Sequence, residues 1–154
     1  MGDLSEAREA AQVAIEDGEE AMRVVRANAS KWNLRSNAIG MMGFSAGGHL
    51  AGMMGMVAAA AERPDFLVLA YPALPKTLAV TAATPRTFLV HADDDKLAAV
   101  DNSVRFYQAL KTAKVPAELH VYSSGGHGFG IRRTDKTSAA WPQALAAWLA
   151  ELPR

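Results

Sequence analysis

Four short runs of apolar residues punctuate the chain and predict four strands. Each run is nearly continuous rather than alternating with polar residues, which is typical of parallel strands covered by helices on both faces. The runs span residues 38–44, 66–71, 86–91 and 117–122. We therefore expect a mostly parallel sheet of about four strands.

Longer segments with helical patterns precede, separate and follow these strands. We expect the first helix to be interrupted near Gly18. The predicted helices span residues 3–31, 46–61, 101–113 and 137–152. The last of them carries one apolar stripe at helical spacing, formed by Trp141, Leu145, Trp148 and Leu149. The order α-β-α-β-β-α-β-α is typical of an α/β fold, and we expect residues 1–154 to form a single domain.

The composition is that of a folded domain with balanced charge. Half of the residues are hydrophobic, and 16 Lys and Arg stand against 16 Asp and Glu without a basic stripe, so we expect no nucleic-acid partner. The longest apolar stretch, residues 50–61, is too short to cross a bilayer, so we expect no membrane partner. No apolar signal-peptide core follows the charged N-terminus, which predicts a cytoplasmic location. The chain has no cysteine, which excludes a thiolate nucleophile.

The pentapeptide at residues 43–47, Gly-Phe-Ser-Ala-Gly, has the G-x-S-x-G pattern of a nucleophile elbow. A catalytic serine must project from a sharp strand-to-helix turn, and small neighbours let the backbone segments approach closely. The context fits, because a predicted strand precedes Ser45 and a predicted helix follows it. Ser45 is therefore the candidate nucleophile.

An acid and a histidine follow Ser45 in the order that this elbow predicts. The predicted strand at residues 86–91 runs into three consecutive aspartates, residues 93–95, and His127 lies in a glycine-rich loop after the last predicted strand. The carboxyl ends of parallel strands share one edge of a sheet, where open α/β folds place their sites. We expect Ser45, one of these aspartates and His127 to meet there.

The remaining histidines favour structural roles. His49 lies four residues after Ser45, at a spacing that can share a helix face, but such a residue more often packs behind the elbow. His91 and His120 lie on predicted strands. The aspartates at residues 93–95 lack calcium-loop spacing and a second ligand cluster, so we expect no metal and no cofactor.

These motifs resemble those of the α/β-hydrolase superfamily of serine esterases, especially its bacterial carbohydrate-esterase and acetylxylan-esterase-like branch. The matching stretches are residues 15–26, 39–51, 87–95 and 125–129. The resemblance implies that Ser45 is the nucleophile, Asp95 the acid and His127 the base. In the family the acid ends an H-G-x-x-D turn, which here begins at His91. Because Ala92 and Lys96 replace the usual Gly and Pro, Asp94 remains a second candidate for the acid.

The resemblance also indicates what this sequence lacks. The first oxyanion donor of such an elbow is the backbone N–H after the nucleophile, here that of Ala46. The second comes from a His-Gly-Gly-Gly type loop upstream, which is absent from this sequence together with several strands. We therefore expect a truncated α/β-hydrolase fold with one identifiable oxyanion donor.

The predicted function is a serine esterase acting on short-chain carboxylic esters of small molecules. The segment at residues 72–86 is shorter than the usual lid-building insertion, which predicts an open site. The alternative is a truncated hydrolase module, catalytically weak or inactive, that is retained for assembly or binding. Because the strand at residues 38–44 lacks its preceding neighbours, we also expect a homodimer through this edge and the helices at residues 3–31 and 46–61.

Overall fold

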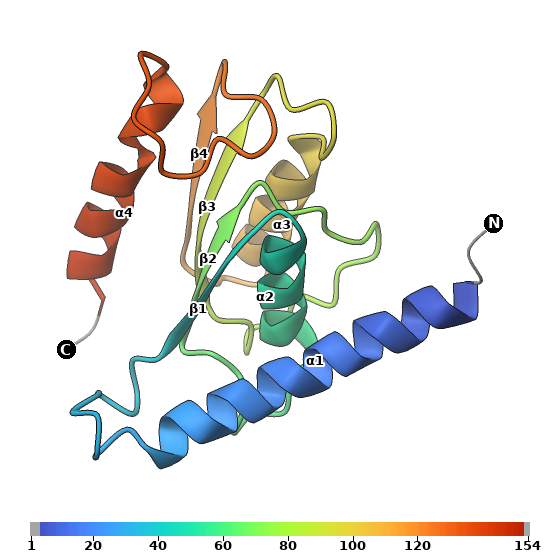
Figure 1. Cartoon of the computed structure of the whole chain (residues 1–154), viewed down its shortest axis with the longest axis vertical. Coiled ribbons are helices and arrows are strands. Elements are labelled where there is room, and N and C mark those ends of the chain that lie inside the picture. The colour runs from blue at the N-terminus through green and yellow to red at the C-terminus, as the bar shows by residue number, and fades with distance from the viewer. Residues whose placement is uncertain (1–3, 153–154) are drawn as a thin grey trace.

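The computed structural model describes residues 4–152, and its elements follow in the predicted order (Figure 1). The elements are α1 (Leu4–Ala27), β1 (Gly40–Phe44), α2 (Ala46–Val57), β2 (Phe66–Ala70), β3 (Arg86–Ala92), α3 (Asp101–Thr112), β4 (Ala117–Tyr122), a 3₁₀ turn η1 (Thr137–Ala140) and α4 (Trp141–Ala150). The predicted start of the first helix at Asp3 lies outside the described residues.

The four strands form one parallel sheet in the order β1-β2-β3-β4. The register pairs Gly43 with Leu69, and Leu69 with Leu89. Because all strands run in the same direction, the residues that follow them gather at one edge of the sheet. The predicted fold class, a mostly parallel sheet flanked by helices, is confirmed.

Successive residues along the strands face opposite layers of helices, as the strand period requires. Leu67 and Leu69 belong to a core shared with Phe106 and Leu110 of α3 and with buried residues of α2. Val68 and its neighbours in the sheet instead pack against α4. Figure 1 shows α2 and α3 on one side of the sheet and α4 on the other. Burial on both faces explains why the strands are continuously apolar.

The predicted apolar stripe of the last helix is correct for three of its four residues. Trp141 and Trp148 are buried, and Leu145 packs against the same cluster of side chains. Leu149, by contrast, is 38% exposed. The helical segment also begins with the separate 3₁₀ turn η1 rather than continuing as one helix from residue 137.

The predicted interruption of the first helix at Gly18 is wrong, because α1 is continuous through it. A Cβ at Gly18 would lie 2.9 Å from the sulfur of Met54, so the glycine allows close helix packing rather than a break. Met22, Met54 and Ala58 form the core between α1 and α2. No helix in the described part of the chain, α1 included, is both long and apolar enough to cross a membrane.

Side-chain hydrogen bonds move several predicted boundaries. The first helix ends at Ala27 rather than near residue 31, and the Asn28 amide donates to the Val24 carbonyl at 2.8 Å. The second helix ends at Val57 rather than at residue 61. Just after this end, the Arg63 guanidinium donates a hydrogen bond to the Ala58 carbonyl.

The first strand begins at Gly40 rather than at residue 38. The Ile39 N–H does not donate to a neighbouring strand, because it donates to the Asp65 carboxylate at 2.8 Å. The other strands agree with their predicted ranges to within one residue.

Within the described residues, β1 forms one edge of the sheet. On this strand Met42 is 44% and Phe44 38% exposed, so apolar side chains accompany an edge whose backbone has no neighbouring strand. Such an edge can pair with another chain. The homodimer expected from the sequence stays a prediction.

Candidate active site

The candidate nucleophile Ser45 stands between the end of β1 and the start of α2, in a strained backbone conformation with φ 53° and ψ −116°. Positive φ is costly for a residue with a side chain and is typical of functional turns. Gly43 makes the turn possible, because a Cβ there would lie 2.0 Å from the Gly47 carbonyl oxygen. Apart from its chain neighbours and the backbone of its own helix, nothing lies within 4 Å of a Cβ built on Gly47, so this glycine faces open space.

Ser45, His127 and Asp95 form one continuous chain of hydrogen bonds. The Oγ of Ser45 lies 2.7 Å from Nε2 of His127, and Nδ1 of His127 lies 2.7 Å from Oδ2 of Asp95. Since an ionised carboxylate only accepts hydrogen bonds, Nδ1 carries the proton and Nε2 accepts from the serine hydroxyl. The imidazole is therefore oriented to remove the Ser45 proton.

The Asp95 carboxylate is buried but well supplied with donors. Its Oδ1 accepts the backbone N–H groups of Leu97 and Ala98, each at 2.9 Å. Burial alone would raise the pKa of Asp95, but the hydrogen bonds from Ala98, His127 and Leu97 outweigh it and hold the pKa below its ordinary value. Asp95 is consequently ionised at neutral pH.

The alternative acid, Asp94, is not hydrogen-bonded to the His127 ring. Asp94 is instead hydrogen-bonded to the backbone of the loop that contains His127. Its Oδ1 accepts the backbone N–H groups of Gly125 and Gly126 at 2.8 and 2.6 Å. The hydrogen bond from Gly126 is the main reason why the pKa of this exposed carboxyl is lowered. Asp94 thus anchors the loop of His127, while Asp95 orients the ring.

His91 is fully buried beside Asp95, at the end of β3. Its Nδ1 lies 2.8 Å from Oγ of Ser103, and its Nε2 lies 2.8 Å from the Ala98 carbonyl and 3.4 Å from Oδ2 of Asp95. Burial is the main cause that lowers the pKa of His91, which keeps the ring neutral. His91 thus has the buried, structural position expected from the sequence, and it also contacts the Asp95 carboxylate of the site.

Tyr71 is a site residue that the sequence did not reveal. It follows β2 with φ 39°, is buried, and sets its ring edge-on to His127 at 5.1 Å and to Phe129 at 4.7 Å between centroids. Burial raises the pKa of the Tyr71 hydroxyl above its ordinary value. The hydrogen bond with the Gly130 backbone and the charge of Arg132 lower the pKa, but by less than burial raises it. The only available signal was its place at the carboxyl end of a predicted strand.

The segment between β2 and β3, residues 71–85, is tied down beside the sheet. Leu74 is buried in the core of α2 and α3, and a Cβ on Gly52 would lie 2.7 Å from it. His49 contributes a 2.6 Å hydrogen bond to the Ala73 carbonyl, and Arg105 of α3 donates to the carbonyls of residues 75 and 76. His49 therefore fastens this segment and does not contact Ser45 Oγ.

The Ala46 N–H, the predicted oxyanion donor, belongs to the first residue of α2. An N–H in the first turn of a helix has no acceptor within the helix, so it is free to bind a developing oxyanion. Before β1, α1 packs against the end of α2 away from the elbow, around Met54 and Ala58.

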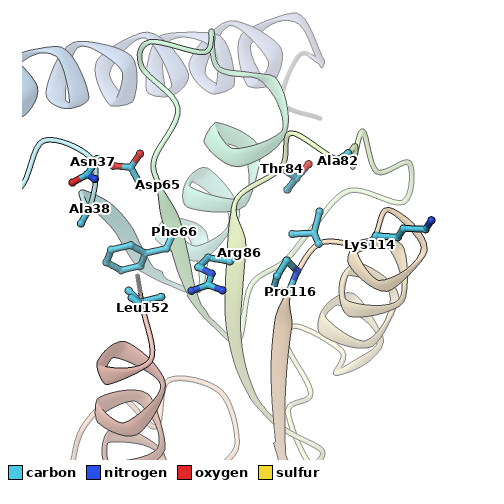
Figure 2. A pocket seen from close by; sticks show the side chains of 11 residues that line it. Asn37, Ala38, Asp65, Phe66, Ala82, Thr84, Arg86, Lys114, Pro116 and Leu152 are labelled. Atoms are coloured by element: carbon cyan, nitrogen blue, oxygen red, sulfur yellow. The ribbon is translucent and has the colours of Figure 1, made fainter. Parts of the chain in front are cut away.

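Two cavities differ in their relation to this site. One of about 360 Å³ lies at the amino ends of the strands, the edge opposite Ser45, and Figure 2 shows Phe66 and Arg86 beside it. The other, of about 220 Å³, is lined by His127 together with residues that include Arg132 and Lys136. Neither is lined by Ser45, which agrees with a nucleophile on an open surface.

Two family models match the chain, one after the other. The model described as BD-FAE matches residues 4–72, which include Ser45, and that of the prolyl oligopeptidase family matches residues 67–153. The second match covers more than half of the chain and includes both Asp95 and His127.

Individual relatives are longer than this chain. The acetylxylan esterase of Xylanibacter ruminicola is 30% identical over an alignment that covers 92% of this chain and 36% of that protein. The crystal structure of an acetyl ester-xyloside bifunctional hydrolase from Caldicellulosiruptor lactoaceticus is 32% identical, with a TM-score of 0.80, and the match covers 90% of this chain and 65% of that one. The crystal structure of MGS-M1, an α/β hydrolase enzyme from a Medee basin deep-sea metagenome library, is 28% identical, with a TM-score of 0.78. That match covers 89% of this chain and 63% of MGS-M1. The chain thus spans about a third of the curated relative and less than two thirds of either structure, and shares their α/β-hydrolase fold.

Proposed function

The chain belongs to the prolyl oligopeptidase family of α/β hydrolases, and we propose that it is a serine esterase acting on short-chain carboxylic esters. The observation that carries the proposal is the hydrogen-bond chain from Ser45 Oγ through His127 to Asp95, with both links at 2.7 Å. A nucleophile, a base and an orienting acid in contact favour an enzyme over a module retained for binding alone.

In the acylation step, Oγ of Ser45 attacks the ester carbonyl carbon while Nε2 of His127 takes the hydroxyl proton. The resulting oxyanion accepts a hydrogen bond from the Ala46 N–H. The ionised Asp95 stabilises the imidazolium through Nδ1–H. When the tetrahedral intermediate collapses, the ester C–O bond breaks, and His127 returns the proton to the leaving alcohol.

In the deacylation step, water attacks the acyl group on Ser45 with His127 again acting as the base. The serine hydroxyl recovers its proton as the carboxylic acid leaves. A single oxyanion donor leaves the intermediate less stabilised than two would, and each such donor is typically worth about 10²–10³ in turnover. We therefore expect slow but measurable hydrolysis by this chain alone.

The relatives suggest the substrate class. One is an acetylxylan esterase and another a hydrolase of acetyl esters and xylosides, so acetyl esters of carbohydrates are the proposed natural substrates. The open space beside Gly47 agrees with an acyl ester carried on a bulky sugar.

The test of this function combines turnover with covalent labelling. The purified chain should hydrolyse p-nitrophenyl acetate and release acetate from acetylated xylo-oligosaccharides. Paraoxon should stop both reactions and add one diethylphosphoryl group, which peptide mass spectrometry places on Ser45. Ser45 is bonded to His127, whereas Ser103, which is bonded to His91, is fully buried and out of reach of the reagent. Protein kept in urea serves as the control, since unfolding separates the triad and should prevent labelling. Hydrolysis that continues after paraoxon treatment would contradict the assignment.

Acyl-chain selectivity follows from the fixed segment between β2 and β3. Leu74 and Arg105 hold this segment against the core, so we expect it to build no deep acyl tunnel over Ser45. We expect kcat/KM for acetyl and butyryl p-nitrophenyl esters to exceed that for the dodecanoyl ester by about tenfold or more, since a long chain would gain little burial. Initial rates below the micelle concentration of each ester measure this. Equal efficiency on acetyl and dodecanoyl esters would show that another surface encloses the acyl chain.

A further inference from the structure

We propose that His91 is a positioning residue of the esterase site, whose Nε2–H is shared with the Asp95 carboxylate and sets how that carboxylate holds His127. The inference rests on the proposed function for its catalytic consequence, but its geometry does not. The four side chains form a row, Ser45–His127–Asp95–His91, of which the last two are completely buried.

The orientation of the His91 ring follows from its partners. The Ala98 carbonyl can only accept, so the nitrogen 2.8 Å from it, Nε2, must carry a hydrogen. In the neutral ring Nδ1 is then an acceptor and takes the hydroxyl hydrogen of Ser103 at 2.8 Å. The same Nε2 atom lies 3.4 Å from Oδ2 of Asp95, a longer contact than its hydrogen bond to the Ala98 carbonyl.

His91 therefore joins three parts of the site. Its ring connects the end of β3 to the turn that contains Asp95 and Ala98, and through Ser103 to α3. The Ala98 N–H in turn donates to Oδ1 of Asp95. Both oxygens of the carboxylate thus have close partners. Oδ1 accepts two backbone N–H groups, and Oδ2 accepts Nδ1–H of His127 and lies 3.4 Å from Nε2 of His91.

The charged surroundings of His91 are simple. Asp95 faces it from its own turn, and His127 acts on it from the loop after β4; the contact from α3 is the neutral Ser103. The N–H of a neutral His91 partly offsets the negative charge on Oδ2. Because the ring has no net charge, it does not compete with the His127 imidazolium for the carboxylate. Removing its N–H should concentrate that charge on the hydrogen bond to His127.

Imidazole ¹H–¹⁵N NMR of the full chain tests the arrangement without relying on activity. In the wild-type protein we expect His91 to be the neutral Nε2–H tautomer at pH 7 and above. In His91→Phe, the low-field Nδ1–H resonance of His127 should move further downfield; in His91→Gln, whose amide places an N–H near the former Nε2, it should return toward the wild-type position. An Nδ1–H tautomer at His91 in the wild-type protein would overturn the proposal even if neither variant folds.

Kinetics supply the second readout. With p-nitrophenyl acetate, we expect His91→Phe to lower kcat about tenfold at unchanged KM, because small misplacements of a catalytic group slow the chemistry and not binding. His91→Gln should recover most of this loss. His120→Phe is the matched control, since His120 lies on the neighbouring strand β4 and pairs with Glu118 instead of the site. An unmoved His127 resonance together with unchanged kcat in His91→Phe would reduce His91 to a packing residue. Absence of hydrolysis in the wild-type chain would contradict the esterase function and leave the NMR outcome to decide the arrangement.

Discussion

Replacing Ser45 by alanine is expected to lower kcat for p-nitrophenyl acetate by about 10⁴–10⁶, because removing the nucleophile of a triad leaves only binding and oxyanion stabilisation. The 2.7 Å contact between Oγ and Nε2 of His127 makes Ser45 the candidate for this role, because Ser103, the other described serine bonded to a histidine, is fully buried. KM should change little, since the serine hydroxyl contributes little to substrate binding in the ground state. Steady-state rates with purified wild-type and variant protein measure both constants.

The same substitution separates chemistry from folding. Alanine meets the same steric cost as serine at φ 53°, so the free energy of unfolding in urea should stay within about 1 kcal/mol of wild type. Exposed Ser123 on the loop after β4 provides a matched serine-to-alanine control that should keep full activity. Hydrolysis that survives Ser45→Ala would assign the reaction to another residue.

The fold was largely predictable because strands that are buried on both faces have nearly continuous apolar sequences. The runs around Leu67–Leu69 and Leu89 contain few polar residues, which is typical of interior parallel strands. The errors lie where tertiary contacts override local pattern. Gly18 reads as a helix breaker by propensity, yet Met54 fills the space beside it, and no property of residues 3–31 alone reveals that contact.

The residue types of the site were predictable from the sequence, but several of their contacts were not. The elbow pattern and the order of Ser45, an acid and His127 are sequence features. The choice between Asp94 and Asp95 depends on the turn after β3, which directs one carboxylate to the ring of His127 and the other to its loop. The positive φ of Tyr71 has no signature in its residue type, and the hydrogen bonds of His91 come from residues 7 and 12 positions later in the chain.

Replacing Asp95 by asparagine is expected to lower kcat by about 10⁴, far more than the same substitution at Asp94. Leu97 and Ala98 donate two N–H groups to one oxygen of the Asp95 side chain, so the new amide must place its own oxygen there. Its NH₂ group then faces His127 and forces Nδ1 to become an acceptor. The hydrogen moves to Nε2, and the ring can no longer take the proton from Ser45.

Asp94→Asn is the matched control, with the same change of atoms one residue away. The amide oxygen can still accept both N–H groups of the His127 loop, from Gly125 and Gly126, so we expect less than about a tenfold loss of kcat. Both variants are compared with p-nitrophenyl acetate at pH 8, where the pKa values of Asp94 and Asp95, both below their ordinary range, leave the wild-type carboxylates ionised. A larger loss for Asp94→Asn than for Asp95→Asn would mean that the loop anchor, not the buried acid, limits catalysis, and would exchange the roles assigned to the two aspartates.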